Sequence, residues 1–162
     1  MGNKDVKNIK HQDKVREHKQ LKGVYLFKHY VLTKNLTPGH RVYDEKLFNF
    51  GGVEYREWKP EKSKLCAAIK KGISQIAIKP GSVVLYLGAS SGTTVSHVSD
   101  IVGHKGFVFA LDFSIQMARD LYYLVKLRSN MAIILKDANY PQTYQELIPP
   151  SMQIDVIYQD IA

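Results

Sequence analysis

Three aspartates stand where apolar runs of the chain end, and this placement could bind a nucleoside. Asp112, Asp137 and Asp160 each follow such a run, and Asp112 comes 20 residues after Gly92. A carboxylate at this distance from a glycine turn can accept hydrogen bonds from both hydroxyls of a ribose. The carboxylate of Asp137 and the backbone N–H of Ala138 could read an adenine edge. Three acids at successive strand ends indicate a binding site.

A turn of small residues, GASSG at 88–92, precedes these acids. Small side chains let a ligand approach the backbone, and Thr93 and Thr94 open a predicted helix whose unpaired N–H groups face that ligand. The turn alone is weak evidence, because similar turns also serve tight packing. Ser90 stands at the second glycine of the dinucleotide-binding fingerprint, and no third glycine follows. These departures argue against a nicotinamide or flavin dinucleotide and favour a nucleoside-type cofactor such as S-adenosylmethionine.

The elements that must position these residues alternate along the second half of the chain. Continuous apolar runs predict strands at 83–87, 107–111, 132–135 and 154–158, and helical spacing predicts helices over 93–102, 115–128 and 140–147. Ser114 is a predicted N-cap. Alternation of this kind predicts a mainly parallel sheet with right-handed crossovers, and sites in such sheets lie beyond the carboxyl ends of the strands.

The first half is organised differently. Residues 1–22 are rich in charge and predict a basic extension, while 23–57 are rich in β-branched and aromatic residues and predict a small antiparallel β region with a turn at Pro38 and Gly39. Residues 58–162 form the predicted α/β domain. Pro60 fits the first turn of a helix there, and Gly72 is a candidate for a local end. Apolar residues recur at helical spacing in this segment: Leu65, Ile69, Ile73 and Ile76.

Charge is distributed unevenly over the 162 residues, whose formal net charge is +8. Residues 1–79 hold 18 Lys and Arg against 8 Asp and Glu, whereas 80–162 hold 5 against 7. A basic first half suggests a polyanionic partner, although lysine-rich surface can also be merely solvated or meet a protein.

Other composition signals narrow the class of protein. No apolar stretch approaches the length of a membrane span and no secretion signal is present, so we expect an intracellular protein without membrane contact. The single cysteine, Cys66, has small apolar neighbours and is expected to be a buried thiol. The six histidines lack the spacing of metal ligands, so we expect no metal site and assign His97 to packing or the helix surface.

The motifs VLYLGASSGTTVSHVSDIVG, ALDFS, KDAN and DVIYQDIA, in this order, closely resemble the fibrillarin family, the RNA 2′-O-methyltransferases of box C/D ribonucleoproteins. The upstream segment VEYREWKPEKSKLCAAI is also similar, so the resemblance runs from about Val24 to the last residue. It implies a Rossmann-like S-adenosylmethionine-dependent methyltransferase fold with a small N-terminal antiparallel β appendage. The lack of an Arg-Gly-rich tail makes the chain resemble the archaeal form.

The resemblance also implies a set of site residues. S-adenosylmethionine would contact the small turn, the helix start and the strand ends, through Ala89, Thr93, Thr94, Asp112, Phe113, Asp137 and Ala138. Asp112 stands where the family more often has glutamate, and Phe113 would lie on the adenine ring, although an isolated Phe is more often a core residue. Lys64 and Asp160 would belong to a Lys-Asp-Lys-His-like catalytic constellation around the ribose hydroxyl.

The family continues past Asp160 with further strands that supply the second lysine and the histidine of that constellation. We therefore expect an incomplete or split form, lacking the C-terminal strands, whose edge a completing C-terminal polypeptide covers. The resemblance implies a Nop-type scaffold protein, box C/D guide RNA and target RNA as partners. It implies a role in rRNA and tRNA modification and processing, in the cytoplasm of an archaeon or the nucleolus of a eukaryote.

Two other functions stay open from the sequence. The first is a catalytically inactive or split binding module that keeps the cofactor, RNA or scaffold contacts and needs a second polypeptide for activity. The second is a small-molecule methyltransferase or a dinucleotide-dependent oxidoreductase, against which the charge asymmetry and the missing third glycine weigh.

Overall fold

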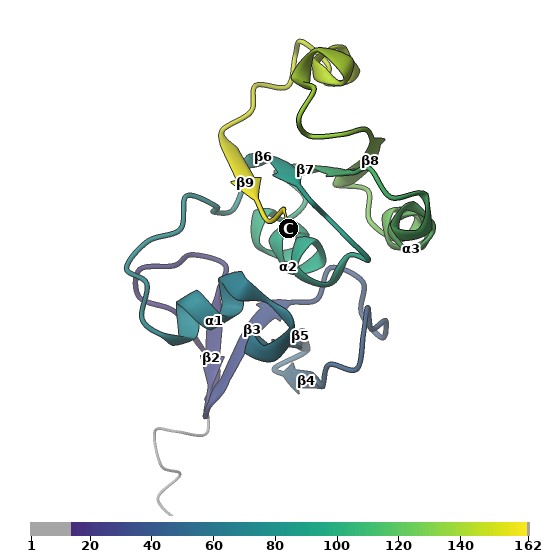
Figure 1. Ribbon diagram of the computed structural model, residues 1–162. Coiled ribbons are helices and arrows are strands. Elements are labelled where there is room, and N and C mark those ends of the chain that lie inside the picture. The colour runs from purple at the N-terminus through teal and green to yellow at the C-terminus, as the bar shows by residue number, and fades with distance from the viewer. Residues whose placement is uncertain (1–13, 162) are drawn as a thin grey trace, which may run out of the picture.

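The computed structural model describes residues 14–161, which form two β-sheets with a helix between them (Figure 1). The helix, α2 (Thr93–Val102), contacts both sheets. The remaining residues, including most of the predicted basic extension, lie outside the described part. Within that part, no helix is long and apolar enough to cross a membrane.

Sheet A is the predicted antiparallel β region, in the strand order β1-β2-β3-β5-β4. Its strands are β1 (Arg16–Glu17), β2 (Tyr25–Phe27), β3 (Tyr30–Lys34), β4 (Leu47–Phe50) and β5 (Val53–Trp58). The sheet starts inside the range predicted for the extension: β1 pairs with β2, and Leu21 is 2% exposed in the core. Both residues of β1 are charged, so the strand carries no apolar signal and the sequence pattern does not reveal it.

Sheet B is parallel, in the order β8-β7-β6-β9, as the alternation of elements predicted. Its strands are β6 (Val83–Leu87), β7 (Phe107–Asp112), β8 (Met131–Leu135) and β9 (Val156–Gln159). The crossover from β7 to β8 is helix α3 (Ile115–Lys126), and the Ser114 hydroxyl caps it by accepting from the Met117 N–H. The connection from β8 to β9 passes through two short 3₁₀ helices, η3 (Pro141–Thr143) and η4 (Gln145–Leu147), and not through the predicted helix.

The helix after Pro60 ends just before Gly72, the candidate end in the sequence, so the apolar spacing of Ile73 and Ile76 does not continue it. The structure has a 3₁₀ turn, η2 (Pro60–Lys62), followed by α1 (Lys64–Lys70). Gly72 has a φ of +90°, and the N–H groups of Gly72 and Ile73 bond back to the carbonyls of Ile69 and Ala68. This is the Schellman arrangement that ends helices. Ile73 consequently lies outside the helix and is 40% exposed.

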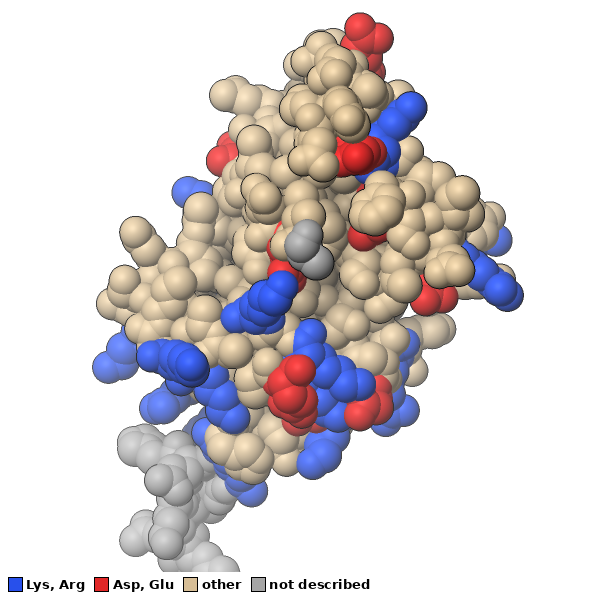
Figure 2. Space-filling view, viewed as in Figure 1, with Lys and Arg blue, Asp and Glu red and all other residues tan. Residues whose placement is uncertain are grey.

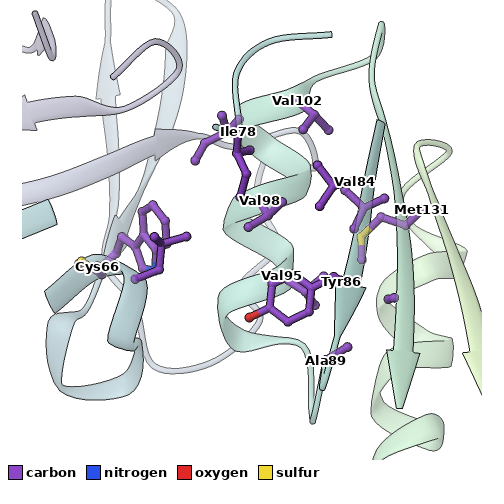
Figure 3. Packing of buried hydrophobic residues seen from close by; sticks show 14 of the residues in the cluster. Cys66, Ile78, Val84, Tyr86, Ala89, Val95, Val98, Val102 and Met131 are labelled. Atoms are coloured by element: carbon purple, nitrogen blue, oxygen red, sulfur yellow. The ribbon is translucent and has the colours of Figure 1, made fainter. Parts of the chain in front are cut away.

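One apolar cluster joins the two sheets through α2 (Figure 3). Val95 and Val98 on α2 are fully buried between Cys66 on the side of sheet A and Val84 on sheet B. Cys66 is 0% exposed, which confirms the predicted buried thiol, and burial raises its pKa to about 12. A second cluster covers the opposite face of sheet B, where Tyr144 packs with Leu85 and Phe109.

Candidate functional site

A cavity of about 670 Å³ opens beyond the carboxyl ends of the strands of sheet B. This is the edge at which parallel α/β sheets place their sites. All nine residues that the sequence predicted for the site line it: Lys64, Ala89, Thr93, Thr94, Asp112, Phe113, Asp137, Ala138 and Asp160. Their placement is thus as expected, while their individual roles remain predictions.

The turn between β6 and α2 forms one wall of the cavity and depends on two glycines. Gly88 has a φ of +88°, and a Cβ there would lie 2.5 Å from the carbonyl oxygen of Asp160. Gly92 has a φ of +103°, and a Cβ there would lie 2.8 Å from a methyl group of Leu124. Both backbone conformations favour glycine. At Gly88 the close atom belongs to the backbone, which cannot move aside, whereas at Gly92 it is the end of a flexible leucine side chain. Gly88 therefore lets the end of β9 lie directly against the turn.

Asp112 is held rigidly at the end of β7. Its side chain accepts hydrogen bonds from the backbone N–H of Ser90 to Oδ2 (2.7 Å) and of Ser114 to Oδ1 (2.9 Å), and the residue is 9% exposed. An ionised carboxylate has about four acceptor positions. Each oxygen thus keeps capacity for a further donor, as the predicted binding of two ribose hydroxyls requires.

The adenine-binding residues predicted from the sequence lie next to Asp112 in the cavity wall. Phe113 is 75% exposed, so it is not a core aromatic. Its ring stands free to stack on a planar ligand. Asp137 accepts from the N–H of Asn139 at 2.9 Å, and the carbonyl of Ala138 accepts from the Tyr144 hydroxyl at 3.2 Å. These two bonds fix the loop after β8 in the wall of the cavity.

The two predicted catalytic residues form an ion pair across the cavity mouth. Lys64 Nζ lies 2.6 Å from Asp160 Oδ1, although the two residues are 96 positions apart. The Lys64 side chain is 77% exposed and that of Asp160 is 18% exposed. The ammonium therefore reaches in from α1 over the end of β9.

A hydroxyl pair that the sequence did not predict links the start of α2 to the start of α1. Thr94 Oγ1 donates to Ser63 Oγ at 3.0 Å, and Ser63 Oγ accepts from the N–H of Cys66 as the N-cap of α1. Ser63 immediately precedes Lys64. The link ties the predicted catalytic lysine to the predicted cofactor helix. The motif SKL offered a signal, because serine before a helix is a common N-cap.

Several further residues line the cavity without having been predicted, among them Lys62, Tyr86, Met117 and Asn139. Tyr86 is the one polar side chain in the apolar run of β6. Burial raises its pKa, so its hydroxyl stays neutral and can donate a hydrogen bond. A single tyrosine within an otherwise apolar strand was the sequence signal that could have identified Tyr86 as a site residue.

A buried charge cluster lies behind α2, between it and sheet A. Arg56 donates to Asp100 (2.9 Å) and to Glu45 (2.8 Å), and Arg128 donates to Asp100 (2.6 Å). These ion-paired side chains are 0% exposed. Burial alone would raise the pKa of Asp100, but the two guanidinium groups lower it, so the cluster is ionised. The cluster fixes α2, and with it the helix start in the cavity wall.

His97 belongs to the same buried region. It is 0% exposed and stacks on Trp58, with ring centroids 5.0 Å apart. Its two ring nitrogens lie 2.7 Å from Thr33 Oγ1 and 2.6 Å from the Tyr43 hydroxyl oxygen. Burial, together with Arg56, lowers its pKa well below 6.5, so the imidazole is neutral. The packing role expected from the sequence agrees with this position. Among residues 14–161 no group of three or more His, Cys, Asp or Glu could hold a metal ion.

Comparisons with known proteins point to one family. Residues 15–162 match the family model described as Fibrillarin. The chain is 49% identical over 154 residues to a fibrillarin-like rRNA/tRNA 2′-O-methyltransferase of Thermococcus onnurineus, a match that covers 92% of this chain and 66% of the relative.

Solved structures agree with this match. The chain is similar to Aeropyrum pernix fibrillarin in complex with natively bound S-adenosyl-L-methionine, with a TM-score of 0.86, 42% identity and coverage of 92% of this chain and 66% of that one. It is also similar to a chain of a fibrillarin/Nop5p complex, with a TM-score of 0.74, 40% identity and coverage of 91% and 64%. These likenesses confirm the predicted methyltransferase fold with its N-terminal antiparallel sheet. The chain spans slightly less than two thirds of the length of these relatives.

Proposed function

Because the chain belongs to the fibrillarin family, we propose that it is the S-adenosylmethionine-dependent RNA ribose 2′-O-methyltransferase subunit of a box C/D guide ribonucleoprotein. It would act in the modification and processing of rRNA and tRNA. The observation that carries the proposal is that one cavity contains both the predicted cofactor residues and the Lys64–Asp160 pair.

The residues of the cavity suit S-adenosylmethionine chemically. Asp112 has unused acceptor capacity for the two ribose hydroxyls, and Phe113 exposes its ring for the adenine. The turn of Ala89 and the start of α2 at Thr93 and Thr94 form the wall for the small zwitterionic end. When bound, the cofactor supplies an electrophilic methyl group.

Lys64 and Asp160 would act on the RNA hydroxyl. The Asp160 carboxylate can accept the proton of a ribose 2′-OH, because Oδ1 is held by Lys64 at 2.6 Å and the side chain is still 18% exposed. The Lys64 ammonium can stabilise negative charge that develops on the 2′-oxygen. The contact between Gly88 and the Asp160 backbone keeps this carboxylate beside the cofactor turn.

A methyl-transfer assay tests these roles, with the completing polypeptide segment, the scaffold protein, guide RNA and target RNA present. We expect Lys64→Ala and Asp160→Asn to lower the transfer rate by about 10²- to 10⁴-fold while calorimetry shows S-adenosylmethionine affinity within error of the parent chain. Lys70→Ala is the control, because Lys70 lies on the same helix but does not line the cavity. Absence of S-adenosylmethionine binding by the parent chain would contradict the proposed function.

The partners follow from the same family membership. A Nop-type scaffold protein would hold the chain on the guide RNA, as supported by the similarity to the chain solved in a fibrillarin/Nop5p complex. Guide pairing would select the nucleotide. The protein would be cytoplasmic in an archaeon and nucleolar in a eukaryote. The alternative of a catalytically inactive binding module is not favoured, because the relatives are named as methyltransferases.

A completing polypeptide segment would cover the outer edge of β9. Among the described strands, β9 pairs only with β6, and Ile157 is 64% exposed on it. An apolar parallel strand with an open edge is a pairing template. We expect a peptide corresponding to the remaining third of a relative to slow amide hydrogen exchange at residues 156–159. Unchanged exchange, with the chain alone a stable and cooperatively unfolding monomer, would contradict this part of the proposal.

A further inference from the structure

The outward face of sheet A carries aromatic side chains where polar ones are expected. On the inner face, Val31 and Trp58 are 4% and 1% exposed against the core. The strand register places the alternate positions of β2, β3, β4 and β5 on the other face. Six of these positions are aromatic and define the aromatic face: Tyr25, Phe27, Tyr30, Phe48, Phe50 and Tyr55.

The rings of the aromatic face form one continuous surface. Ring centroids lie 4.7 Å apart for Phe27 and Phe50, 5.1 Å for Tyr30 and Phe48, and 5.1 Å for Tyr25 and Tyr55. Contacts of Phe27 with Phe48 at 5.6 Å and of Phe50 with Tyr55 at 6.0 Å join these pairs. Tyr55 and Leu32, which the register places on the same face, are buried at 6% and 0% exposure, and the other five rings are half-buried. A solvated sheet face ordinarily presents polar side chains. Where a sequence departs from such a local rule, the reason is often function.

Lysine ammonium groups lie among the rings. Lys34 Nζ is 5.2 Å from the centroid of Tyr25, and Lys46 Nζ is 5.1 Å from that of Tyr30 and donates to its hydroxyl at 2.9 Å. Neither lysine forms an ion pair with a carboxylate of residues 14–161. A third ammonium, that of Lys28, is 5.2 Å from the Phe27 ring.

The acids near this face are occupied by the backbone. Glu17 accepts from the N–H of Gly23 at 2.9 Å, and Glu57 accepts from the N–H of Lys46 at 3.1 Å. Both acids keep their negative charge, and the three lysines Lys28, Lys34 and Lys46 outnumber them, so the charge around the aromatic face is cationic on balance. Figure 2 shows that Lys and Arg are numerous on the lower part of the molecule around sheet A, with some acidic side chains among them.

We propose that the aromatic face binds single-stranded RNA, with bases stacked on its rings and phosphates held by Lys34 and Lys46. Aromatic rings interleaved with cations are the common chemistry of single-strand platforms, because every base has a π-face and every nucleotide a phosphate. An A-form duplex keeps its bases stacked on one another and cannot use the rings. No side chain of the aromatic face lines the cavity of the proposed reaction, so this binding is independent of methyl transfer.

The test measures fluorescence anisotropy of a labelled, unstructured oligouridylate titrated with the full chain. The double variant Tyr30→Leu/Phe48→Leu removes two rings but keeps apolar volume. We expect it to weaken binding by at least about fivefold for each ring that stacks a base. The variant Tyr30→Phe/Phe48→Tyr keeps both rings and should bind like the parent chain. The same strand annealed to its complement should bind the parent chain more weakly.

The lysines are tested through salt dependence. Lys34→Gln/Lys46→Gln should reduce the slope of log affinity against log salt by about 0.7 for each phosphate that a lysine no longer neutralises. The matched control is on α3, where Lys126 Nζ lies 5.0 Å from the Tyr122 ring centroid. Tyr122→Leu and Lys126→Gln remove the same residue types at a site off sheet A, and they should leave affinity and slope unchanged.

Thermal unfolding confirms that each variant is folded, and calorimetry with S-adenosylmethionine separates this proposal from the proposed function. Loss of RNA affinity in the Tyr30 and Phe48 leucine variant, with cofactor affinity retained, supports the platform. Three results would overturn it: equal RNA affinity in the leucine variant and the parent chain, equal losses in the α3 controls, or equal affinity for duplex and single strand. A leucine variant that keeps RNA affinity but loses the scaffold protein would make the face a protein interface instead.

Discussion

Replacing Asp100 by asparagine should destabilise the chain by about 3–5 kcal/mol, although it exchanges one oxygen for one nitrogen. The carboxylate is 0% exposed and lies between two guanidinium groups. Oδ1 accepts from Arg128 at 2.6 Å, and Oδ2 accepts from Arg56 at 2.9 Å and from the Thr33 hydroxyl at 2.8 Å. The variant would leave both cations buried with one counter-charge fewer.

The size of this loss of stability depends on which ion pairs the two arginines retain in the variant. Arg56 still pairs with Glu45 at 2.8 Å, whereas Arg128 has no other ion pair among the described residues. The asparagine amide also presents N–H groups to side chains that are themselves donors. Removing one partner of a buried pair leaves an uncompensated charge, which is the source of the large cost. Because small proteins are stable by only about 5–15 kcal/mol, this one atom would remove a large share of the total.

Urea unfolding followed by circular dichroism measures the loss as a lower midpoint with an unchanged m-value. The control is Asp44→Asn. Asp44 also contacts two cations, Lys59 at 2.8 Å and Lys62 at 2.6 Å, but its side chain is 64% exposed. Water screens such pairs, so we expect little change. If both variants lost the same stability, burial would not decide the strength of these charges and the reasoning would be refuted.

Three further predictions concern separate residues. Burial holds the pKa of His97 well below 6.5 in the folded chain, so as the pH falls below 6.5 only the unfolded chain takes up a proton there. The free energy of unfolding should therefore decrease by about 1.4 kcal/mol for each pH unit of acidification. Urea unfolding at several pH values should show that His97→Asn lacks this contribution. Phe113→Ala should weaken S-adenosylmethionine binding by about 2- to 12-fold in calorimetry, whereas Ile115→Ala, at a neighbouring position that is 77% exposed, should not; equal effects would contradict stacking. Gly88 and Gly81 have nearly the same φ, +88° and +87°, but only a Cβ at Gly88 would lie against the backbone of another segment. Thermal unfolding should therefore show a clearly larger loss of stability for Gly88→Ala than for Gly81→Ala.

The parts of the fold that could be predicted are those in which local pattern and tertiary position agree. Strands buried on both faces read as continuous apolar runs, so the predicted bounds of β6 are confirmed. The gathering of Asp112, Asp137 and Asp160 followed from one topological fact, that parallel strands end at the same edge. In α1 two signals disagreed: the apolar spacing continues to Ile73, whereas Gly72 indicated a local end, and the structure follows the glycine.

Contacts between distant segments could not be predicted. Arg56 and Asp100 lie 44 positions apart in the sequence. Because charged residues are ordinarily exposed, no local sequence pattern predicts that these two form a buried pair. The hydroxyl contact between Ser63 and Thr94 is of the same kind. In both cases the two residues become neighbours only because the chain folds around α2.

The apolar cluster that passes through α2 joins sheet A to sheet B, so the N-terminal strands support the second half of the chain and are not a separable module. Trp58 and Val31 pack in the same cluster as Val98 and Val84. A gene fragment that began at residue 58 would strip one side of α2 bare and open Trp58 to water. Heat should accordingly melt both sheets in a single step, and a protease that cuts sheet A should loosen α2 as well.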